Sequence, residues 1–418
     1  MRIAMVSEHA NPLAVLGGVD AGGQNVHVAE LARALGARGH DVVVHTRRDD
    51  PGQPDYVQLA PGVRVHHVTA GPPEPIGKDD LLEHVPELAR GLRRAWRQET
   101  PEVVHAHYWM SGLAAIDAAA DLRLPVALTF HALGSVKRRY YGDADTSPAS
   151  RVDSELHLAR RVDRVIATSP HEVDELVAMG ASPNRIEVIP CGIDLAQFRP
   201  RGERLARAGT RPLLLSIGRL VPRKGVDDAI RMLTWLPDCE LVVAGGPAAD
   251  HLDADAEVQR LRQLACESGV SERVTFLGAV GRADVPTLMR SADMVVCLPW
   301  YEPFGIVPVE AMACGTSVLG VRVGGLLDTV EDGGTGLLVA PRDPHAAALA
   351  ARRMLAAPGL LRAMRERGPV RAAEQFSSQS VARRTESAYL DLVTGMTEPG
   401  AARVPQARSA DRTVGVRG

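Results

Sequence analysis

The sequence has few cysteines and no excess of charge of either sign. Its 418 residues include five Cys without a Cys-x-x-Cys pair, so we expect neither a disulfide scaffold nor a cysteine zinc site. Lys and Arg number 48 against 51 Asp and Glu, which gives a formal net charge of −3. This balance argues against nucleic acid as the main partner, because binding it requires a field of basic residues. Apolar residues make up 45% of the chain, which excludes overall disorder.

Long hydrophobic runs are missing as well. No stretch approaches the ~20 apolar residues of a membrane-spanning helix. The first strand-like segment turns polar at Ser7, before a signal-peptide core could form. We therefore expect a cytoplasmic protein without a membrane span, in which the cysteines are small buried residues of a reducing compartment.

Short β-branched runs alternate with segments of helical period along most of the chain, which predicts an α/β fold with parallel strands and crossover helices. The first group of expected strands is 2–7, 41–46, 63–68, 103–108, 125–131, 164–169 and 185–189. After an Arg-rich stretch, a second group is 213–218, 240–245, 274–278, 294–298, 317–321 and 336–339. Two doubly wound, Rossmann-like domains are therefore predicted, at residues 1–200 and 210–380.

The end of the chain divides into a helix and a tail. Residues 381–395 carry apolar side chains at helical spacing, which predicts an amphipathic helix. Residues 396–418 have few large apolar residues and many of Gly, Pro, Ala and Arg. We expect this segment to be a disordered tail.

Two turns that follow expected strands could bind phosphate. Gly22 and Gly23 belong to a glycine-rich turn that starts at Gly17 and opens a helix, where free backbone N–H groups either bind an anion or merely allow tight packing. Arg219 and Lys224 follow the strand 213–218, at the edge of an α/β sheet where ligands bind. Two cations at this position can hold a diphosphate.

The most informative segment, residues 302–310, also follows a strand. Pro303 and Gly305 fix a turn, so Glu302 is expected in a loop and Glu310 on the helix behind it, both facing one cleft. Carboxylates only accept hydrogen bonds, which suits the hydroxyl groups of ribose and of a second sugar.

Together these motifs resemble the large retaining glycosyltransferase family 4 of GT-B fold. The resemblance rests on the Glu-x7-Glu segment, on Gly-Arg-Leu-x3-Lys-Gly at 218–225, on Gly22-Gly23, and on Ile-Pro-Cys-Gly-Ile-Asp-x3-Phe at 189–198. It extends from residue 1 to about residue 395. It implies that two domains face each other across a cleft, with the nucleotide sugar mainly on the C-terminal domain and the acceptor on the N-terminal one. The last helix would cross back to the first domain.

The resemblance also implies a donor site, made of Gly22, Gly23, Arg219, Lys224, Glu302, Phe304, Gly305, Ile306 and Glu310. Arg219 and Lys224 would neutralise the departing nucleoside diphosphate, and the two glycine amides would contact its distal phosphate. Glu310 would bind the ribose hydroxyls. Glu302, with the backbone amides of residues 304–306, would bind the transferred sugar.

Catalysis is expected from four residues, His131, Arg219, Lys224 and Glu302. The resemblance places His131 against the donor sugar, near the reacting carbon. No protein nucleophile is obvious, so the resemblance implies front-face attack with retention, in which a phosphate oxygen takes the proton of the acceptor. No metal and no cofactor are expected, because the two cations supply the positive charge of a divalent ion. The Asp-x-Asp triplets at 143–145 and 253–255 are interpreted as solvated loops.

Within the family, the N-terminal half is similar to the inositol-phosphate N-acetylglucosaminyltransferases of mycothiol synthesis. That similarity maps an acceptor site, suited to an anion, onto Asn25, Lys78, Tyr108 and Arg151. Three positions depart from that branch: Gln24 replaces a Met, Ala132 replaces a Thr that would contact phosphate, and Pro303 replaces a Ser.

Other phrases leave the substrates open. Gly-Gly-Gln at 22–24 is similar to sucrose-phosphate synthases, whereas 131–134, 145–148 and 299–302 look more like actinobacterial heptose and octose transferases, including a lincosamide S-glycosyltransferase. Abundant Ala, Arg, Gly and Val with little Lys also fit an actinobacterial source. The expected function is transfer from a UDP or GDP sugar to a small polar acceptor, in small-thiol or antibiotic biosynthesis.

Proteins of two other classes remain as alternatives. A GT-B nucleotide-sugar epimerase would use the same cleft and release nucleotide without an acceptor. A non-catalytic binding protein would show affinity without turnover. A pyridoxal-phosphate phosphorylase would need a cofactor lysine, and none stands out in a suitable motif. The expected partners are the small-molecule donor and acceptor, and the oligomeric state is left open, with a homodimer as one option.

Overall fold

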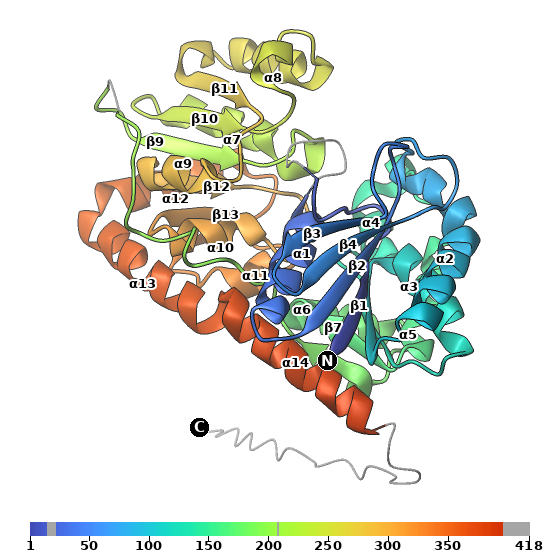
Figure 1. The fold of residues 1–418 in the computed structure, drawn as a ribbon. Coiled ribbons are helices and arrows are strands. Elements are labelled where there is room, and N and C mark those ends of the chain that lie inside the picture. The colour runs from blue at the N-terminus through green and yellow to red at the C-terminus, as the bar shows by residue number, and fades with distance from the viewer. Residues whose placement is uncertain (15–21, 207–208, 396–418) are drawn as a thin grey trace, which may run out of the picture.

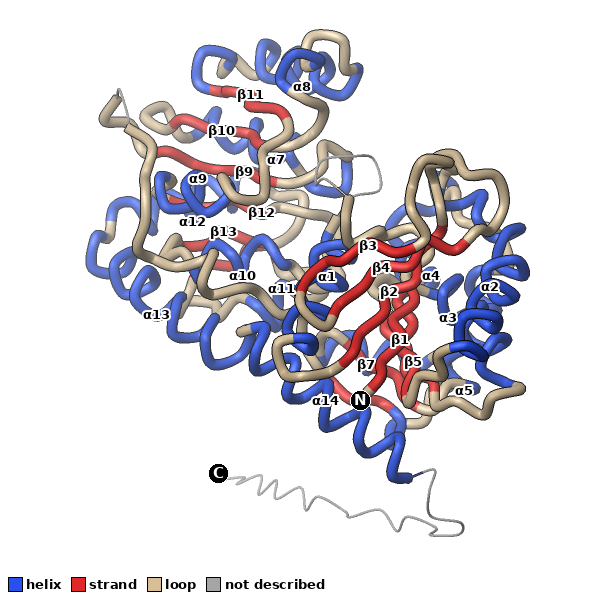
Figure 2. Tube along the Cα trace, viewed as in Figure 1, coloured by secondary structure: helices blue, strands red, loops and turns tan. Residues whose placement is uncertain are grey.

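The computed structural model describes residues 1–14, 22–206 and 209–395, which form two α/β domains (Figure 1). Each domain is built on one mainly parallel sheet with helices packed on its faces (Figure 2). The predicted fold class is therefore confirmed. Residues 17–21 of the glycine-rich turn and the expected disordered tail, 396–418, lie outside the described residues.

The first sheet has eight strands in the order β3-β4-β2-β1-β5-β6-β7-β8. Their bounds are β1 Arg2–Val6, β2 Asp41–Arg47, β3 Tyr56–Ala60, β4 Val63–Val68, β5 Val103–His107, β6 Val126–Thr129, β7 Arg164–Ala167 and β8 Ile186–Val188. The sequence analysis missed β3, which pairs antiparallel with β4 at the edge of the sheet. No residue of β3 is fully buried, so it has no continuous apolar run to mark it.

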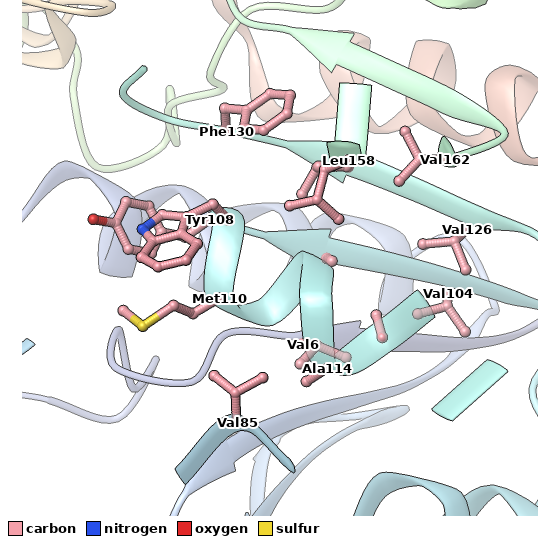
Figure 3. Close-up of a cluster of buried hydrophobic side chains, with 14 of the residues drawn as sticks. Val6, Val85, Val104, Tyr108, Met110, Ala114, Val126, Phe130, Leu158 and Val162 are labelled. Carbon is pink, nitrogen blue, oxygen red and sulfur yellow. The ribbon is translucent and has the colours of Figure 1, made fainter. Parts of the chain in front are cut away.

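The helices that lie between the strands of this sheet in the chain are α1 Gly23–Gly36, α2 Val85–Gln98, α3 Trp109–Ala120, α4 Gly134–Tyr141, α5 Arg151–Arg161 and α6 Pro170–Ala178. Figure 3 shows part of the core between helix and sheet, where Ala114 of α3 and Leu158 of α5 lie near Val104 of β5 and Val126 of β6. These side chains are at most 4% exposed. Their burial fixes the strand ends that carry the site.

The second sheet has six parallel strands in the order β11-β10-β9-β12-β13-β14. They are β9 Leu213–Ile217, β10 Glu240–Ala244, β11 Val274–Gly278, β12 Met294–Cys297, β13 Ser317–Val321 and β14 Gly336–Val339. The helices are α7 Val226–Met232, α8 Ala256–Glu267, α9 Val285–Ser291, α10 Ile306–Ala313, α11 Leu326–Thr329, α12 Pro344–Ala356 and α13 Pro358–Phe376. All six strands fall where the sequence predicts them.

Strand order reverses direction once in each sheet, next to β1 and β5 in the first and next to β9 and β12 in the second. Open α/β sheets bind ligands outside the carboxyl ends of strands at such switch points. The turns that follow these four strands contain most of the residues that the motifs singled out. Topology and motifs therefore point to one place.

The chain passes between the domains twice, at neighbouring points. Ile193, on the way out, pairs with Ser377, on the way back, through a hydrogen bond of 2.9 Å from the Ile193 amide to Phe376. Helix α14, Ser378–Gly395, then runs along the first domain, where Figure 1 shows it below β1 and α6. Its Tyr389 is fully buried, with its hydroxyl 2.6 Å from Nδ1 of His105. The predicted crossing helix is confirmed.

Among the described residues, no helix is both long enough and apolar enough to span a bilayer.

Candidate active site

A cleft between the two domains holds most of the predicted donor residues. From the first domain it is lined by Gly22, Gly23 and Val26. From the second domain its lining includes Arg219, Arg223, Lys224, Arg282, Glu302, Gly305, Ile306 and Glu310. Glu302 and Glu310 therefore line the same cleft.

Lys224 is held at the cleft by a tight turn after β9. The next residue, Gly225, has φ of +70°, and a Cβ atom there would lie 1.8 Å from the carbonyl oxygen of Leu298. Only glycine fits this close approach between two backbone segments. The turn thereby brings Lys224 against the loop that follows β12, where its ammonium contacts the Glu302 carboxylate.

Glu302 is a partly buried carboxylate surrounded by cations, with 15% of its side chain exposed. Its carboxylate contacts Lys224 and lies 3.7 Å from Nη1 of Arg223. Burial alone would raise the pKa of Glu302, but Lys224 and Arg223 outweigh it and hold the pKa below its ordinary value, with a smaller contribution from Arg219. Burial in turn lowers the pKa of Lys224, which Glu302 opposes. Glu302 is therefore ionised at neutral pH.

The charges that line the cleft do not cancel. Four cationic side chains, Arg219, Arg223, Lys224 and Arg282, stand against two carboxylates, Glu302 and Glu310. An excess of positive charge in a partly desolvated cleft favours an anionic ligand. A diphosphate group has the sign and the size to balance it.

Glu310 lies on α10 and is 1% exposed. Burial raises the pKa of its carboxyl group, and an ion pair with Arg282 opposes this shift. The Arg282 guanidinium also lies over the ring of Phe198, 4.4 Å from the ring centroid. The sequence analysis missed Arg282, because this residue, in the loop after β11, belongs to none of the motifs on which that analysis relied.

The glycine turn of the first domain lies close to Arg219 of the second domain. A Cβ atom on Gly22 would lie 3.6 Å from Nε of Arg219, so the two predicted phosphate-binding elements approach each other across the cleft. Gly305 is the N-cap residue of α10 and has φ of +88°, and together with Ile306 it lines the cleft. Phe304 is not among the lining residues, and its ring packs edge-on against Phe376.

His131 follows β6 and has φ of +61°, an uncommon backbone conformation for a residue with a side chain. Such strain persists where surrounding structure holds it, and it is found at functional sites. The next two residues, Ala132 and Leu133, line a small pocket together with Tyr301 and Pro303, which flank Glu302. The end of β6 is therefore adjacent to the Glu302 loop.

Three of the four predicted acceptor residues gather around one aromatic ring. Tyr108 is 3% exposed, with Nζ of Lys78 5.3 Å and Cζ of Arg151 5.1 Å from its ring centroid. Arg151 is itself buried and paired with Glu155 at 2.8 Å, so part of its charge is already neutralised. Beside this ring lies His9, bonded to the buried carboxylate of Glu8, and neither residue was expected from the sequence.

The fourth acceptor candidate, Asn25, fastens the glycine turn. Its side-chain oxygen accepts the Gly22 N–H at 3.0 Å, and its amide nitrogen donates to the Asn11 carbonyl at 3.0 Å. These hydrogen bonds orient the start of α1. They occupy both the oxygen and the nitrogen of the Asn25 side-chain amide, which leaves it few further hydrogen bonds to offer a ligand. Asn25 itself is 4% exposed and is not among the residues that line the cleft, whereas the glycine turn that it holds is.

The two Asp-x-Asp triplets have local structural partners. Asp145 pairs with Lys137 at 2.9 Å, and Asp255 caps α8 by accepting the Val258 amide at 2.9 Å. Within the described part of the chain, neither triplet belongs to a group of three or more side chains placed to share a metal ion.

Comparison with known proteins identifies relatives over nearly the full length. The family model described as Glycosyltransferase Family 4 matches residues 21–197, and the one described as Glycosyl transferases group 1 matches residues 201–371. A D-inositol 3-phosphate glycosyltransferase from Acidothermus cellulolyticus is 38% identical, with 96% of this chain and 94% of the relative covered. One from Streptomyces bingchenggensis is 36% identical, with 94% and 90% covered. The solved sucrose-phosphate synthase from Thermosynechococcus elongatus superposes with a TM-score of 0.87 at 32% identity, with 94% and 99% covered.

Proposed function

The chain belongs to the family 4 glycosyltransferases of GT-B fold, and from this premise we propose that it transfers a sugar from a nucleoside diphosphate sugar to a small phosphorylated acceptor. The proposal of a nucleotide-sugar donor rests on one observation: four cationic side chains line the cleft, against only two carboxylates. These charges would stabilise the diphosphate as it leaves, where negative charge grows in the transition state.

The donor would lie mainly on the second domain. Arg219 and Lys224 would hold the diphosphate, and the N–H groups at Gly22 and Gly23 would reach its distal phosphate from the first domain. Glu310 would accept hydrogen bonds from the ribose hydroxyls. In this structure its carboxylate is paired with Arg282 instead. Glu302 would accept hydroxyls of the transferred sugar, since its lowered pKa keeps it an acceptor at neutral pH.

The acceptor would lie on the first domain, beside Tyr108. Lys78 and Arg151 flank this ring, and cations at that position would attract a phosphate group. The relatives named D-inositol 3-phosphate glycosyltransferases favour an inositol phosphate as the acceptor. Because Ala132 replaces a Thr, the proposed acceptor site lacks one hydroxyl contact to phosphate that the inositol-phosphate transferases would have.

The transfer would proceed with retention. The bond from the anomeric carbon to the phosphate oxygen breaks, the acceptor oxygen bonds to the same face of that carbon, and the acceptor proton passes to an oxygen of the leaving diphosphate. His131 would orient the sugar at the reacting carbon. The two domains enclose the site and exclude water, which would otherwise hydrolyse the donor.

Two measurements test this function. Thermal stability is first measured against UDP, GDP, ADP and dTDP, because a nucleotide at ~100 times its dissociation constant adds roughly 2.7 kcal/mol to the free energy of unfolding. A selective UDP or GDP shift identifies the donor. The matching nucleotide sugars are then incubated with D-inositol 3-phosphate, and products are identified by mass spectrometry and their anomeric configuration by NMR. The proposal fails if no nucleotide stabilises the protein, and a nucleotide released from donor alone, with an isomerised sugar, indicates an epimerase instead.

A further inference from the structure

Three histidines from separate elements meet at the end of the first sheet. His27 lies on α1, His107 ends β5 and His131 follows β6. One ring nitrogen of each lies within 4.8 Å of one ring nitrogen of the other two. Across the described residues, no other group of three or more His, Cys, Asp or Glu side chains has this arrangement. The glycosyl transfer proposed above assigns a role only to His131.

Two nitrogens of this group lack a partner in the described part of the chain. Nδ1 of His107 bonds Nε2 of His131 at 3.0 Å, but Nε2 of His107 and Nδ1 of His27 are buried and form no hydrogen bond there. His107 is fully buried and His27 is 4% exposed. Buried polar groups are nearly always satisfied, so the unpartnered Nδ1 of His27 is the nitrogen that indicates a missing ligand.

The residue type and the placement of the group suit a metal. Each of the three rings offers one nitrogen to a common centre, and a neutral imidazole donates a lone pair to a metal ion.

We propose that His27, His107 and His131 form a binding site for one divalent transition ion of the zinc class. Zinc sites with three histidines keep a fourth position for water or a substrate atom. Bonds of ~2.0–2.1 Å in a tetrahedron place the ligand nitrogens about 3.3 Å apart. Nδ1 of His107 and Nε2 of His131 already stand 3.0 Å apart, and an ion bound to both replaces their hydrogen bond, so mainly the His27 ring has to move. No carboxylate belongs to the set, so the fourth position is left to water or to a substrate atom.

This site shares one residue with the proposed donor site. If His131 orients the donor sugar, an ion bound to its ring competes with the donor. Zinc is then an inhibitor of sugar transfer, not a cofactor of it. This consequence rests on the proposed function, whereas ion binding itself does not.

The experiment measures ion binding directly, on the full chain freed of metal by a chelator and held at pH 7.5. CoCl2 is titrated while the visible spectrum reports tetrahedral nitrogen coordination, and ZnCl2 is titrated by calorimetry. We expect one ion per chain. His27→Phe should weaken binding at least tenfold, since loss of even an outer partner of a metal ligand costs about 10–100-fold. The matched control is His66→Gln, which changes a histidine that also faces another histidine, His45, outside the group.

Each result decides the matter. Absence of saturable cobalt binding by the wild-type protein overturns the proposal, and this holds even if His27→Phe does not fold. Equal affinity in wild-type protein and His27→Phe also overturns it. If cobalt binds but zinc does not inhibit sugar transfer, ion binding stands and only the proposed competition between the ion and the donor is overturned. A failure of the proposed glycosyl transfer leaves the cobalt titration unaffected, so the two proposals fail separately.

Discussion

At the scale of the residue, the cleft depends on how buried carboxylates are compensated. Glu302 and Glu310 both follow from the sequence pattern, yet each is stabilised by cations that the pattern did not assign, Arg223 and Arg282. A buried carboxylate without such a partner is costly and takes up a proton instead. The candidate site therefore includes charged residues that compensate the two glutamates and that no sequence motif identified.

The Arg282–Glu310 pair gives a first prediction. Arg282→Met leaves Glu310 buried without its counter-charge, so we expect the free energy of unfolding to fall by about 1–3 kcal/mol. Urea denaturation measures this loss. Adding Glu310→Gln to Arg282→Met should recover part of it, because an amide is cheaper to bury than a carboxylate. If the double variant is no more stable than Arg282→Met, the pair does not compensate Glu310.

A second prediction concerns turnover. Lys224→Met removes a cation next to the leaving diphosphate, and we expect kcat to fall by about 100-fold or more while the fold stays intact, in line with loss of one preorganised charge. Arg322→Met, which removes a cation paired with Asp332 at the protein surface, is the matched control and should keep wild-type rates. Steady-state kinetics and circular dichroism are the measurements. Unchanged kcat in Lys224→Met would contradict the assignment of this residue.

At the scale of the element, α14 joins the two ends of the chain into one domain. It begins beside Ile193 at the crossing point and packs its buried face against α1 and the end of the first sheet. Tyr389 links this helix to β5 through His105, whose other nitrogen lies 2.9 Å from Oγ1 of Thr129 on β6. The strand ends that carry His107 and His131 are thus supported from behind by the last helix.

This support predicts a graded loss of stability. Tyr389→Ala empties a fully buried site and should lower the free energy of unfolding by about 3–5 kcal/mol. Tyr389→Phe keeps the ring but leaves His105 without its partner, which should cost about 1 kcal/mol. Leu390→Ala changes the adjacent residue, which is 46% exposed, and should stay within about 0.5 kcal/mol of wild type. Comparable losses at Tyr389 and Leu390 would show that α14 is not docked in this way.

At the scale of the whole molecule, buried neutral histidines should make stability depend on pH. Burial lowers the pKa of His66 to about 4, and burial with help from His66 and Arg64 lowers the pKa of His45 well below the ordinary value. The unfolded chain takes up these protons near pH 6.5 and the folded chain does not. Their stabilising contribution is therefore complete above pH 6.5 and is lost as the pH falls toward 4.

The expected size is about 1 kcal/mol per pH unit for each such histidine. The free energy of unfolding should fall between pH 7.5 and pH 5, and chemical denaturation at the two values measures the change. In His66→Gln the fall should be smaller, because one of the titrating groups is gone. A wild-type stability that rises toward pH 5 would contradict this assignment.

Local chemistry let the sequence predict the two sheets, the last helix and a shared cleft for Glu302 and Glu310. The family resemblance added the crossing of that helix and one donor site that also includes Arg219 and Lys224. Buried parallel strands need continuous apolar runs, and turns that follow such strands must lie at one edge of the sheet. The sequence did not predict the edge strand β3. This strand pairs along one side only and has no fully buried residue, so it needs no apolar pattern.

Only the tertiary structure decided which distant residues meet. Arg282 reaches Glu310 from another loop, and His27, His107 and His131 converge from a helix and two strand ends that are spaced along the first 131 residues. No period or spacing in the sequence encodes such meetings, because they arise from the packing of elements that are already formed. The sequence thus determined what each element is, and the packing of those elements determined which side chains form an ion pair, form a hydrogen bond or lie together.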